Sequence, residues 1–428
     1  MRFLALIASC VYLASAKILQ NGQVRITDYP DTTIPSIAGH NSSWRTYPRN
    51  ARELSYKGRW DDNYISWWTA PGLKFGFQGS QVAVAFGNNT SPEVLIAYRV
   101  GGLDWQLTNV SAGTTHLLAD SQATGFDSGT TQTFEVRVTN WDYGVQIQNV
   151  YVASGRLVQI PDFRRRIEIV GDSLSAGQYA TLEGIASYSW GLAYGLGNTE
   201  FSITAYPGMC AYDGNGGYCY GGGPRQRGQE HQWLKVSDNS ERAVAMYGNS
   251  KNTIHVMKNE GSLSDPPNYN FRAHPPADIT IINLGANDSG QNVSDEQFFN
   301  AYTKLIDEIR RQWPRTQFII LNLWHFTQSG STWITDSPLD NVIQNVARHY
   351  NRGSLNENGG QGIVHYFNTT GILEHNDISP AGHPTDVADV KLASHLMQYI
   401  KLVFGWDLEQ EGPEVQHQTT YWNDEVNY

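Results

Sequence analysis

Apolar and polar residues alternate with a period of two through the first third of the chain. The alternation is clearest at residues 81–86 and 133–138, and Val145 and Ile147 continue it after a turn. Clusters of small polar residues, such as Gly87-Asn88-Asn89, separate these runs, and no helical stretch stands out. Short alternating strands between turn signals predict an all-β sandwich over residues 17–155. Trp60, Trp67 and Trp68 are expected in such a strand, facing the core.

The pattern changes beyond a linker at residues 154–166. Short continuous apolar runs, typical of fully buried strands, occur at 167–170, 201–204, 279–284, 318–323 and 363–367. Between them lie segments with a helical period, for example 295–312 and 387–403. Strands that alternate with helices predict a parallel sheet with helices on both faces. We therefore expect a second, α/β domain over residues 166–408.

Composition limits the classes of protein that remain. The chain has 428 residues, and its 30 Lys plus Arg against 41 Asp plus Glu give a formal net charge of −11. This length suits two domains better than one hydrophobic core. Charged residues make up 17% and aromatic residues 12%, which excludes a mostly disordered chain. An acidic chain offers few cation contacts to phosphates, so we expect no nucleic-acid partner.

The N-terminus indicates export. Residues 1–16 read MRFLALIASCVYLASA, with a positive start, an apolar stretch and a small-residue cleavage pattern. The apolar part is too short to span a bilayer, and residues 409–428 form a polar, acidic tail. We expect a signal peptide at 1–16 and a secreted, extracellular protein with no membrane partner. The alternative is an N-terminal strand or helix of the mature fold.

Export also changes how the cysteines are interpreted. Removal of Cys10 with the signal peptide leaves Cys210 and Cys219, and a pair in an oxidising compartment is expected to form a disulfide. Closing so short a loop contributes about 2–3 kcal/mol in the chain-entropy model. Zinc ligation would need further ligands at suitable spacing. A glycoprotein is also expected, from acceptor tripeptides that begin at Asn41, Asn88, Asn109, Asn292 and Asn368.

Candidate chemistry begins where the first strand of the second domain ends, at Gly171-Asp172-Ser173-Leu174. A serine between a strand end and a helix start lies at the carboxyl edge of the sheet, where such folds bind ligands. Neighbouring backbone N–H groups can face developing negative charge there. This geometry suits Ser173 as a nucleophile. The alternative is that Ser173 is an ordinary helix cap.

Two later segments join this serine in a recognisable order. Gly285-Ala286-Asn287-Asp288 follows the strand at 279–284, and Gly382-His383-Pro384 precedes the last helix. With Ser173, these blocks resemble the SGNH/GDSL hydrolase superfamily over about residues 166–406. The resemblance implies a three-layer α/β/α fold with Ser173 as nucleophile and His383 as general base. It also implies an oxyanion hole formed by the Ser173 backbone, Gly208 and the Asn287 side chain.

The first domain carries a narrower resemblance. Residues 58–61 (GRWD) and 67–75 (WWTAPGLKF) are similar to the N-terminal module of carbohydrate esterase family two. Those enzymes pair a jelly-roll-like sandwich with an SGNH domain and remove acetyl groups from plant polysaccharides. The resemblance therefore implies a serine esterase of the acetylxylan-esterase type.

The partner of the histidine departs from the superfamily pattern. The usual aspartate lies three residues before the histidine, and that position holds Pro380. Asp377 lies six residues before His383, and Asp386 is expected to open the last helix instead. Some members of carbohydrate esterase family two work with a Ser–His pair alone. A triad completed by Asp377 and a dyad are both open at this point.

Together with the export signal, these resemblances imply a secreted serine esterase that removes acetyl groups from an acetylated polysaccharide or oligosaccharide such as xylan or mannan. We expect no cofactor, because Ser–His ester cleavage needs none, and no metal site, because the histidines are dispersed. One alternative is a GDSL lipase or acylhydrolase that prefers longer acyl chains. Another is a non-catalytic carbohydrate-binding protein, which exposed aromatic residues would suit. Tyr212, Tyr218, Trp233 and Trp324 could stack on sugar rings near the cleft, and the favoured alternative for each is ordinary core packing.

Overall fold

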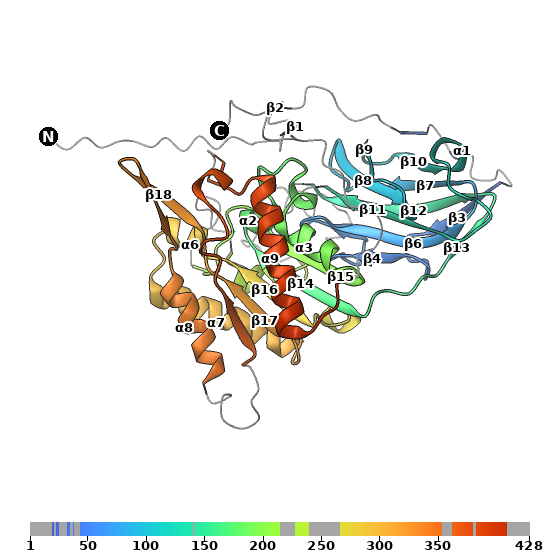
Figure 1. Cartoon of the computed structure of the whole chain (residues 1–428). Helices are drawn as coiled ribbons and strands as arrows, with labels where there is room; N and C mark the ends of the chain where they lie inside the picture. Colours follow the sequence, from blue (N-terminus) through green and yellow to red (C-terminus); the bar gives the residue numbers. More distant parts are fainter. Residues whose placement is uncertain are drawn as a thin grey trace, which may run out of the picture.

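A computed structural model describes residues 19–20, 23–24, 32–34, 37, 43–139, 141, 143–214, 227–238, 266–352, 362–379 and 382–408. Antiparallel strands fill the N-terminal part as far as Val158, and a parallel sheet with helices begins at Arg165. Figure 1 shows the two parts side by side, the strands in blue and cyan and the α/β part in green to red. The predicted fold class, a sandwich followed by an α/β/α domain, is confirmed.

Two antiparallel sheets form the sandwich. One has the order β10-β7-β12-β3 with β5 beside β12, and the other has the order β13-β6-β11-β8-β9 with β4 beside β6. Alternate side chains of both sheets meet in one apolar core that includes Phe75, Val84 and Phe134. The strands are β3 (Trp44–Pro48), β4 (Ser55–Lys57), β5 (Ile65–Ser66), β6 (Gly72–Gln78), β7 (Gln81–Phe86), β8 (Val94–Val100), β9 (Gln106–Val110), β10 (Thr115–Asp120), β11 (Gln132–Val138), β12 (Val145–Ala153) and β13 (Arg156–Val158).

Short elements accompany the sandwich. Helix α1 (Ser121–Thr124) follows β10, and its N-cap Asp120 accepts a hydrogen bond from the backbone of Gln122. Strands β1 (Leu19–Gln20) and β2 (Gln23–Val24) form a two-stranded antiparallel sheet.

The second domain is built on a five-stranded parallel sheet with the order β15-β14-β16-β17-β20. Its strands are β14 (Arg165–Gly171), β15 (Thr199–Ala205), β16 (Ile279–Asn283), β17 (Gln317–Leu321) and β20 (Val364–Phe367). These are the five continuous apolar runs of the sequence. The strand order reverses at β14, and ligands of such sheets bind at the carboxyl ends of the strands beside a reversal of this kind.

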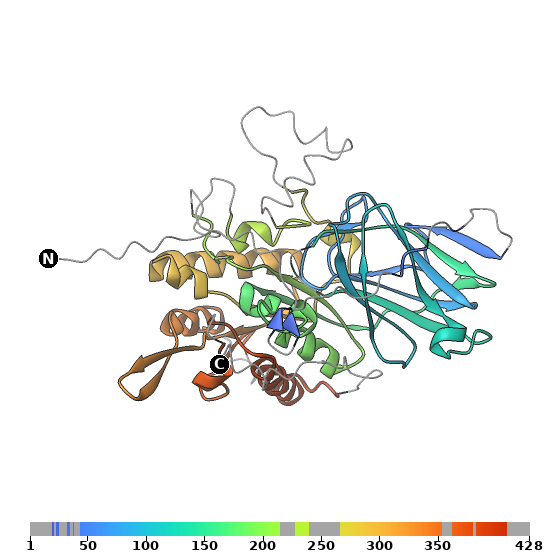
Figure 2. The same ribbon diagram turned by 90° about the horizontal axis from the view of Figure 1, so that it is seen from above.

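Helices cover both faces of this sheet, as the view from above in Figure 2 shows. Helices α3 and α9 pack together on one side, and α7 and α8 pack together on the other. Helix α7 occupies the residues predicted from its period, and a capping box between Ser294 and Gln297 starts it. The helical elements are α2 (Ser173–Ala176), η1 (Glu183–Ile185), α3 (Tyr188–Leu196), α4 (Gln229–Gln232), η2 (Phe271–Ala273), α6 (Ala286–Gly290), α7 (Asp295–Gln312), α8 (Asp340–Asn351), η3 (His375–Asp377) and α9 (Asp386–Phe404).

A two-stranded hairpin extends from the end of β17. It consists of β18 (His325–Ser329) and β19 (Thr332–Asp336), and Figure 1 shows it projecting from the α/β domain. Among the described helices, none has the length and apolarity needed to cross a membrane.

The two domains are joined by a shared core. Eight buried sandwich residues belong to the same hydrophobic cluster as the α/β domain: Ile65, Trp67, Trp68, Ala70, Leu95, Ala97, Trp105 and Trp141. Buried ion pairs also cross the junction, such as Arg59 with Glu168 at 2.8 Å and Lys57 with Glu200 at 2.7 Å.

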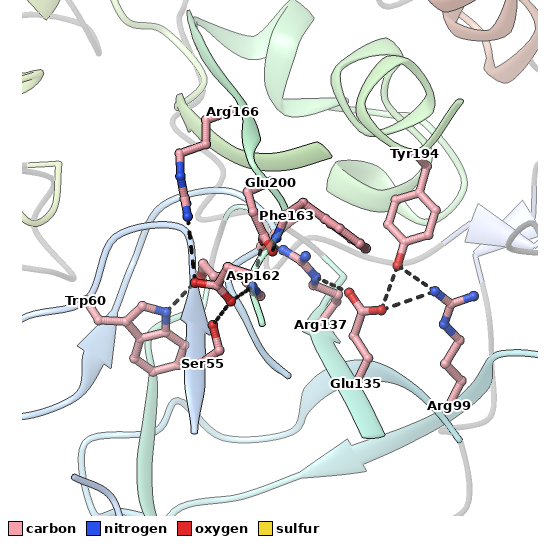
Figure 3. A network of polar contacts seen from close by, with 12 residues as sticks. Ser55, Trp60, Arg99, Glu135, Arg137, Asp162, Phe163, Arg166, Tyr194 and Glu200 are labelled. Atoms are coloured by element: carbon pink, nitrogen blue, oxygen red, sulfur yellow. Dashed lines mark hydrogen bonds and ion pairs between the residues drawn. The ribbon is translucent and has the colours of Figure 1, made fainter. Parts of the chain in front are cut away.

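A second polar group at the same junction is drawn in Figure 3. Glu135 of the sandwich lies between Arg99 and Arg137 and accepts a 2.9 Å hydrogen bond from the Tyr194 hydroxyl on α3. Because breaking such buried contacts is costly, the two domains behave as one body rather than as modules on a linker.

Candidate active site

Ser173 lies two residues beyond the last residue of β14, at the first position of the short helix α2. Asp172 caps this helix, because its Oδ1 accepts a 2.9 Å hydrogen bond from the backbone N–H of Leu174. Glycine is needed at position 171, since a Cβ there would lie 2.1 Å from the Ser175 hydroxyl oxygen. The strand end therefore turns sharply and presents Ser173 at the carboxyl edge of the sheet.

His383 reaches Ser173 from a loop 210 residues further along the chain. Its Nε2 lies 2.8 Å from the Ser173 Oγ, which is hydrogen-bond distance for a nucleophile and its base. The loop is folded back on itself: the Ser379 N–H donates to the His383 carbonyl at 2.8 Å, and Ile378 pairs with Pro384. The structure thus brings together the two side chains that the sequence selects for acid–base chemistry.

Gly208 sits at the corner of a turn that follows β15. Pro207 and Gly208 occupy its two central positions, and the Met209 N–H donates to the Tyr206 carbonyl at 3.4 Å. Gly208 has a φ of +79°, the left-handed value that the third residue of a type II turn requires. Glycine is therefore demanded here by the backbone.

Asn287 and Asp288 hold this turn from the side of β16. The Asn287 Nδ2 donates to the Met209 carbonyl at 3.0 Å and to the Asp172 carboxylate at 3.2 Å. The two oxygens of Asp288 accept hydrogen bonds from the backbone of Ala211 at 2.9 Å and Tyr212 at 3.0 Å. Asn287 is therefore close to the turn, although both of its donor contacts are to protein acceptors.

Two backbone donors at neighbouring strand ends, the N–H groups of Ser173 and Gly208, are candidates for the oxyanion hole. Within the described part of the chain, neither the Ser173 N–H nor the Gly208 N–H has a hydrogen-bond acceptor. Buried backbone donors are normally paired, so an unpaired N–H beside a reactive hydroxyl is suited to an anionic oxygen. With the Asn287 amide nearby, the three expected donors lie on neighbouring strand ends.

Two carboxyl groups under the site are unusually basic. Burial, together with the negative charge of Asp288, raises the pKa of Asp172 to about 7. The hydrogen bond from the Leu174 N–H lowers this pKa but does not offset the effect of burial. Burial likewise raises the pKa of Asp288 to about 6. No feature of the sequence marks this environment, which depends on the packing of α2 against the loop after β16.

Asp377 is turned away from the catalytic pair. Its two carboxylate oxygens lie 2.8 and 2.7 Å from the Nζ of Lys391 on α9, and its Oδ2 also accepts a hydrogen bond from the Glu374 backbone. No described contact joins this carboxylate to His383. Asp386 lies in the first turn of α9, where its Oδ1 accepts from the Thr181 backbone.

Sequence reasoning missed Tyr179, which packs against the histidine. The Tyr179 ring meets the His383 ring edge to face, with centroids 4.9 Å apart, and its side chain is 49% exposed. Its φ of +71° is unusual for a residue other than glycine. Such strain concentrates at functional sites, but a positive φ at a tyrosine leaves no signal in the sequence.

The aromatic residues proposed for sugar contact divide into several groups. Trp233 and Trp324 are buried, Tyr212 is partly buried, and Tyr218 lies outside the described residues. An aromatic face not singled out from the sequence is Trp333 on the hairpin. It is 44% exposed and stacks flat on His375, with centroids 4.8 Å apart.

The disulfide expected between Cys210 and Cys219 falls next to the Gly208 turn. Cys210 is buried beside the Gly208 turn, and Cys219 lies outside the described residues, so their disulfide stays a prediction.

The signal peptide and the acidic tail lie outside the described residues as well. Among the residues that the structure describes, no group of three or more His, Cys, Asp or Glu side chains is arranged to hold a metal ion.

A parallel α/β/α domain with a serine and a histidine in contact at its strand ends has the architecture of the SGNH hydrolases. Residues 169–386 match the model of the GDSL-like lipase/acylhydrolase family, and the chain belongs to that family. No curated protein matches the sequence.

Solved structures resemble the whole two-domain fold. A family two carbohydrate esterase from Clostridium thermocellum, in complex with cellohexaose, is 20% identical and has a TM-score of 0.62, covering 83% of this chain and 100% of its own. A Corynascus thermopiles (Myceliophthora fergusii) family 2 enzyme with a carbohydrate-binding domain is 18% identical, with a TM-score of 0.61 and coverages of 82% and 100%. An acetyl xylan esterase from the rumen bacterium Butyrivibrio proteoclasticus is 15% identical, with a TM-score of 0.62 and coverages of 85% and 100%. At these identities the likeness defines the fold, and the predicted resemblance to family two is confirmed at that level.

Proposed function

We propose that this protein is a secreted serine esterase that removes acetyl groups from plant cell-wall polysaccharide, such as xylan or mannan. The observation that carries the proposal is the 2.8 Å contact between His383 Nε2 and Ser173 Oγ. It lies beside two unpaired backbone donors, within a chain of the GDSL-like family.

The reaction follows from these groups. His383 accepts the proton of the Ser173 hydroxyl as its oxygen attacks the acetyl carbonyl carbon. The N–H groups of Ser173 and Gly208 donate to the oxygen that becomes negatively charged. The Asn287 amide supplies the third donor. Its Nδ2 gives up the hydrogen bond to Asp172, the longer of its two contacts, and donates to the oxygen of the ester instead. His383 then protonates the departing sugar oxygen, and a water molecule, activated by the same imidazole, releases acetate from Ser173.

We expect Asp377 not to be the carboxylate partner of His383. Lys391 and the Glu374 backbone engage the Asp377 carboxylate, which supports a Ser–His dyad over a triad. Asp377 would then serve the site by fastening the loop that carries His383 to helix α9.

Several observations support a carbohydrate ester as the substrate. The structural relatives include an acetyl xylan esterase and an esterase in complex with cellohexaose. The partly exposed faces of Tyr179 and Trp333 are of the kind that stack on sugar rings. The positive start, apolar stretch and small-residue cleavage pattern of residues 1–16 support export.

Acetate release from defined acetylated xylan, mannan and cello-oligosaccharides tests the proposal, with Ser173→Ala as the inactive control. We expect acetate from the wild type, stoichiometric labelling of Ser173 by a serine-directed phosphonate, and neither in Ser173→Ala. Faster cleavage of long-chain acyl esters than of acetyl esters would instead indicate a lipase. Binding of oligosaccharide without labelling or acetate release would indicate a carbohydrate-binding protein.

A further inference from the structure

The sandwich contacts the catalytic domain at the strand that leads to the Gly208 turn. This strand, β15, is an edge strand of the parallel sheet. Thr69 of the sandwich forms an antiparallel bridge with Ile203 on β15, and its Oγ1 donates a 2.9 Å hydrogen bond to the carbonyl of Ala205. Ala205 is the last residue of β15, three residues before Gly208. The sandwich therefore fixes the end of the strand that carries the turn.

A second sandwich residue packs on the turn itself. The Trp141 ring meets the Tyr206 ring edge to face, with centroids 5.1 Å apart and planes at 89°. Both rings are buried, and both belong to the core that the two domains share. Tyr206 is the first residue of the turn whose second corner is Gly208. A shift of the Tyr206 ring would therefore move the Gly208 N–H.

The same part of the sandwich also touches the other side of the site. A Cβ on Gly184 would lie 2.8 Å from the Thr69 Cγ2 and 2.9 Å from the Thr139 carbonyl, so these chains are in close approach. The Ile185 N–H donates to that Thr139 carbonyl at 3.1 Å. The η1 turn in turn packs on Gly177, which ends α2. Thr69 thus lies between the segments that hold the Ser173 helix and the Gly208 turn.

From these contacts we propose that the β-sandwich is a working part of the active site. Thr69 and Trp141 are positioning residues that hold the Gly208 N–H where the negatively charged oxygen of the transition state forms. The proposal rests on the esterase function proposed above. It differs from a role in carbohydrate binding, because it predicts that the sandwich acts on the chemical step.

The geometry predicts a specific kinetic signature. An oxyanion donor interacts with the transition state more strongly than with the bound ester, so its displacement lowers kcat and leaves KM nearly unchanged. Displacements well below 1 Å matter, because the donor must stay within about 2.7–3.1 Å of the oxyanion. A sandwich that only bound polysaccharide would change KM for the polymer and leave kcat for a small acetyl ester intact.

Thr69→Val in the full-length chain is the direct test, since it removes the hydroxyl and keeps the shape. Thr108→Val is the matched control, because Thr108 is an equally buried threonine on β9 within the sandwich. For a small acetyl ester we expect kcat of Thr69→Val to fall tenfold or more, with KM within twofold and phosphonate labelling of Ser173 slowed in parallel. Thr69→Ser, which restores the hydroxyl, should stay within threefold of the wild type.

Trp141→Phe and its control Trp60→Phe repeat the comparison for the ring contact, since Trp60 packs in the sandwich's own core. Thermal unfolding of all five variants shows whether an activity loss follows a loss of fold. If the wild type is active and Thr69→Val and Thr108→Val have equal kcat values, the inference about the sandwich is wrong, while the proposed esterase function stands. A wild type that neither releases acetate nor reacts with the phosphonate would overturn the proposed function as well.

Discussion

Lys391, on the helix that follows the His383 loop, donates hydrogen bonds from its Nζ to both carboxylate oxygens of Asp377, at 2.8 and 2.7 Å. The carboxylate that would complete a triad is therefore paired with a cation 14 residues further along the chain. This pairing decides what its removal should do.

We expect Asp377→Asn to lower kcat less than tenfold and Lys391→Met to have a similar effect. Both changes break the same ion pair, and neither removes a partner of the imidazole. Steady-state hydrolysis of a small acetyl ester measures the effect. In serine hydrolases with a true triad, replacing the aspartate by asparagine lowers kcat about 10⁴-fold. A loss of several hundredfold in Asp377→Asn, with Lys391→Met unaffected, would show that Asp377 serves His383.

Asn287→Ala should lower kcat by about 10²–10³-fold, the usual cost of deleting one oxyanion donor. KM should change little. Asn287→Asp should be worse, because it places a third carboxyl group beside Asp172 and Asp288, whose own ionisation burial already disfavours. If Asn287→Ala retained more than a tenth of wild-type kcat, the amide would serve only to hold the Met209 carbonyl.

Tyr179 allows strain and function to be separated. Its left-handed backbone favours glycine, so Tyr179→Gly should be more stable than Tyr179→Ala by about 1 kcal/mol, measured by denaturant unfolding. Both variants lose the ring against His383, so both should lose activity to the same extent. Tyr179→Phe retains that ring contact and should remain within threefold of the wild type. Activity restored by Tyr179→Gly would contradict a role for the ring.

Glu135 predicts a pH dependence of stability. Burial opposes its ionisation, but the positive charges of Arg137, Arg99 and Lys74 prevail and lower its pKa to about 2, from 4.5. Because the folded state favours the ionised Glu135 carboxylate, this group contributes its full stabilisation above pH 4.5. The contribution is lost as the pH falls from 4.5 to 2.

Glu135→Gln should therefore lower the free energy of unfolding at pH 7 by about 3–5 kcal/mol, because it leaves buried guanidinium groups unpaired. The difference from the wild type should shrink as the pH falls from 4.5 to 2. Denaturant unfolding at several pH values measures both. Glu53→Gln is the control, since its partner Arg52 is exposed, and it should change stability by less than about 1 kcal/mol. A difference that is constant from pH 7 to pH 2 would contradict this assignment.

Much of the fold was open to prediction because its signals are local. The strand at 167–170 and the helix at 295–312 follow directly from the spacing of their apolar residues, and the structure contains β14 and α7 at those places. Ser173, Asn287 and His383 were found because each follows a strand or precedes a helix. Parallel strands then bring their ends to one edge.

Contacts between distant loops were not predictable. Trp67 and Trp68 are buried as expected, but they lie just beyond β5 rather than within a strand, and both belong to the core that the two domains share. The Trp141–Tyr206 and Thr69–Ala205 contacts join residues 65 and 136 positions apart, and no periodicity marks them. The Asp377–Lys391 pair depends on how a loop folds back on a helix.

The bridge from Thr69 to β15 also bears on how such a protein can change through evolution. An uncovered edge strand offers unpaired backbone groups to any other extended chain and invites aggregation. A gene fragment encoding the α/β half alone would expose β15 in this way. A domain joined only by a linker could be replaced by an unrelated one. The sandwich cannot be replaced in this way unless the new domain also covers β15.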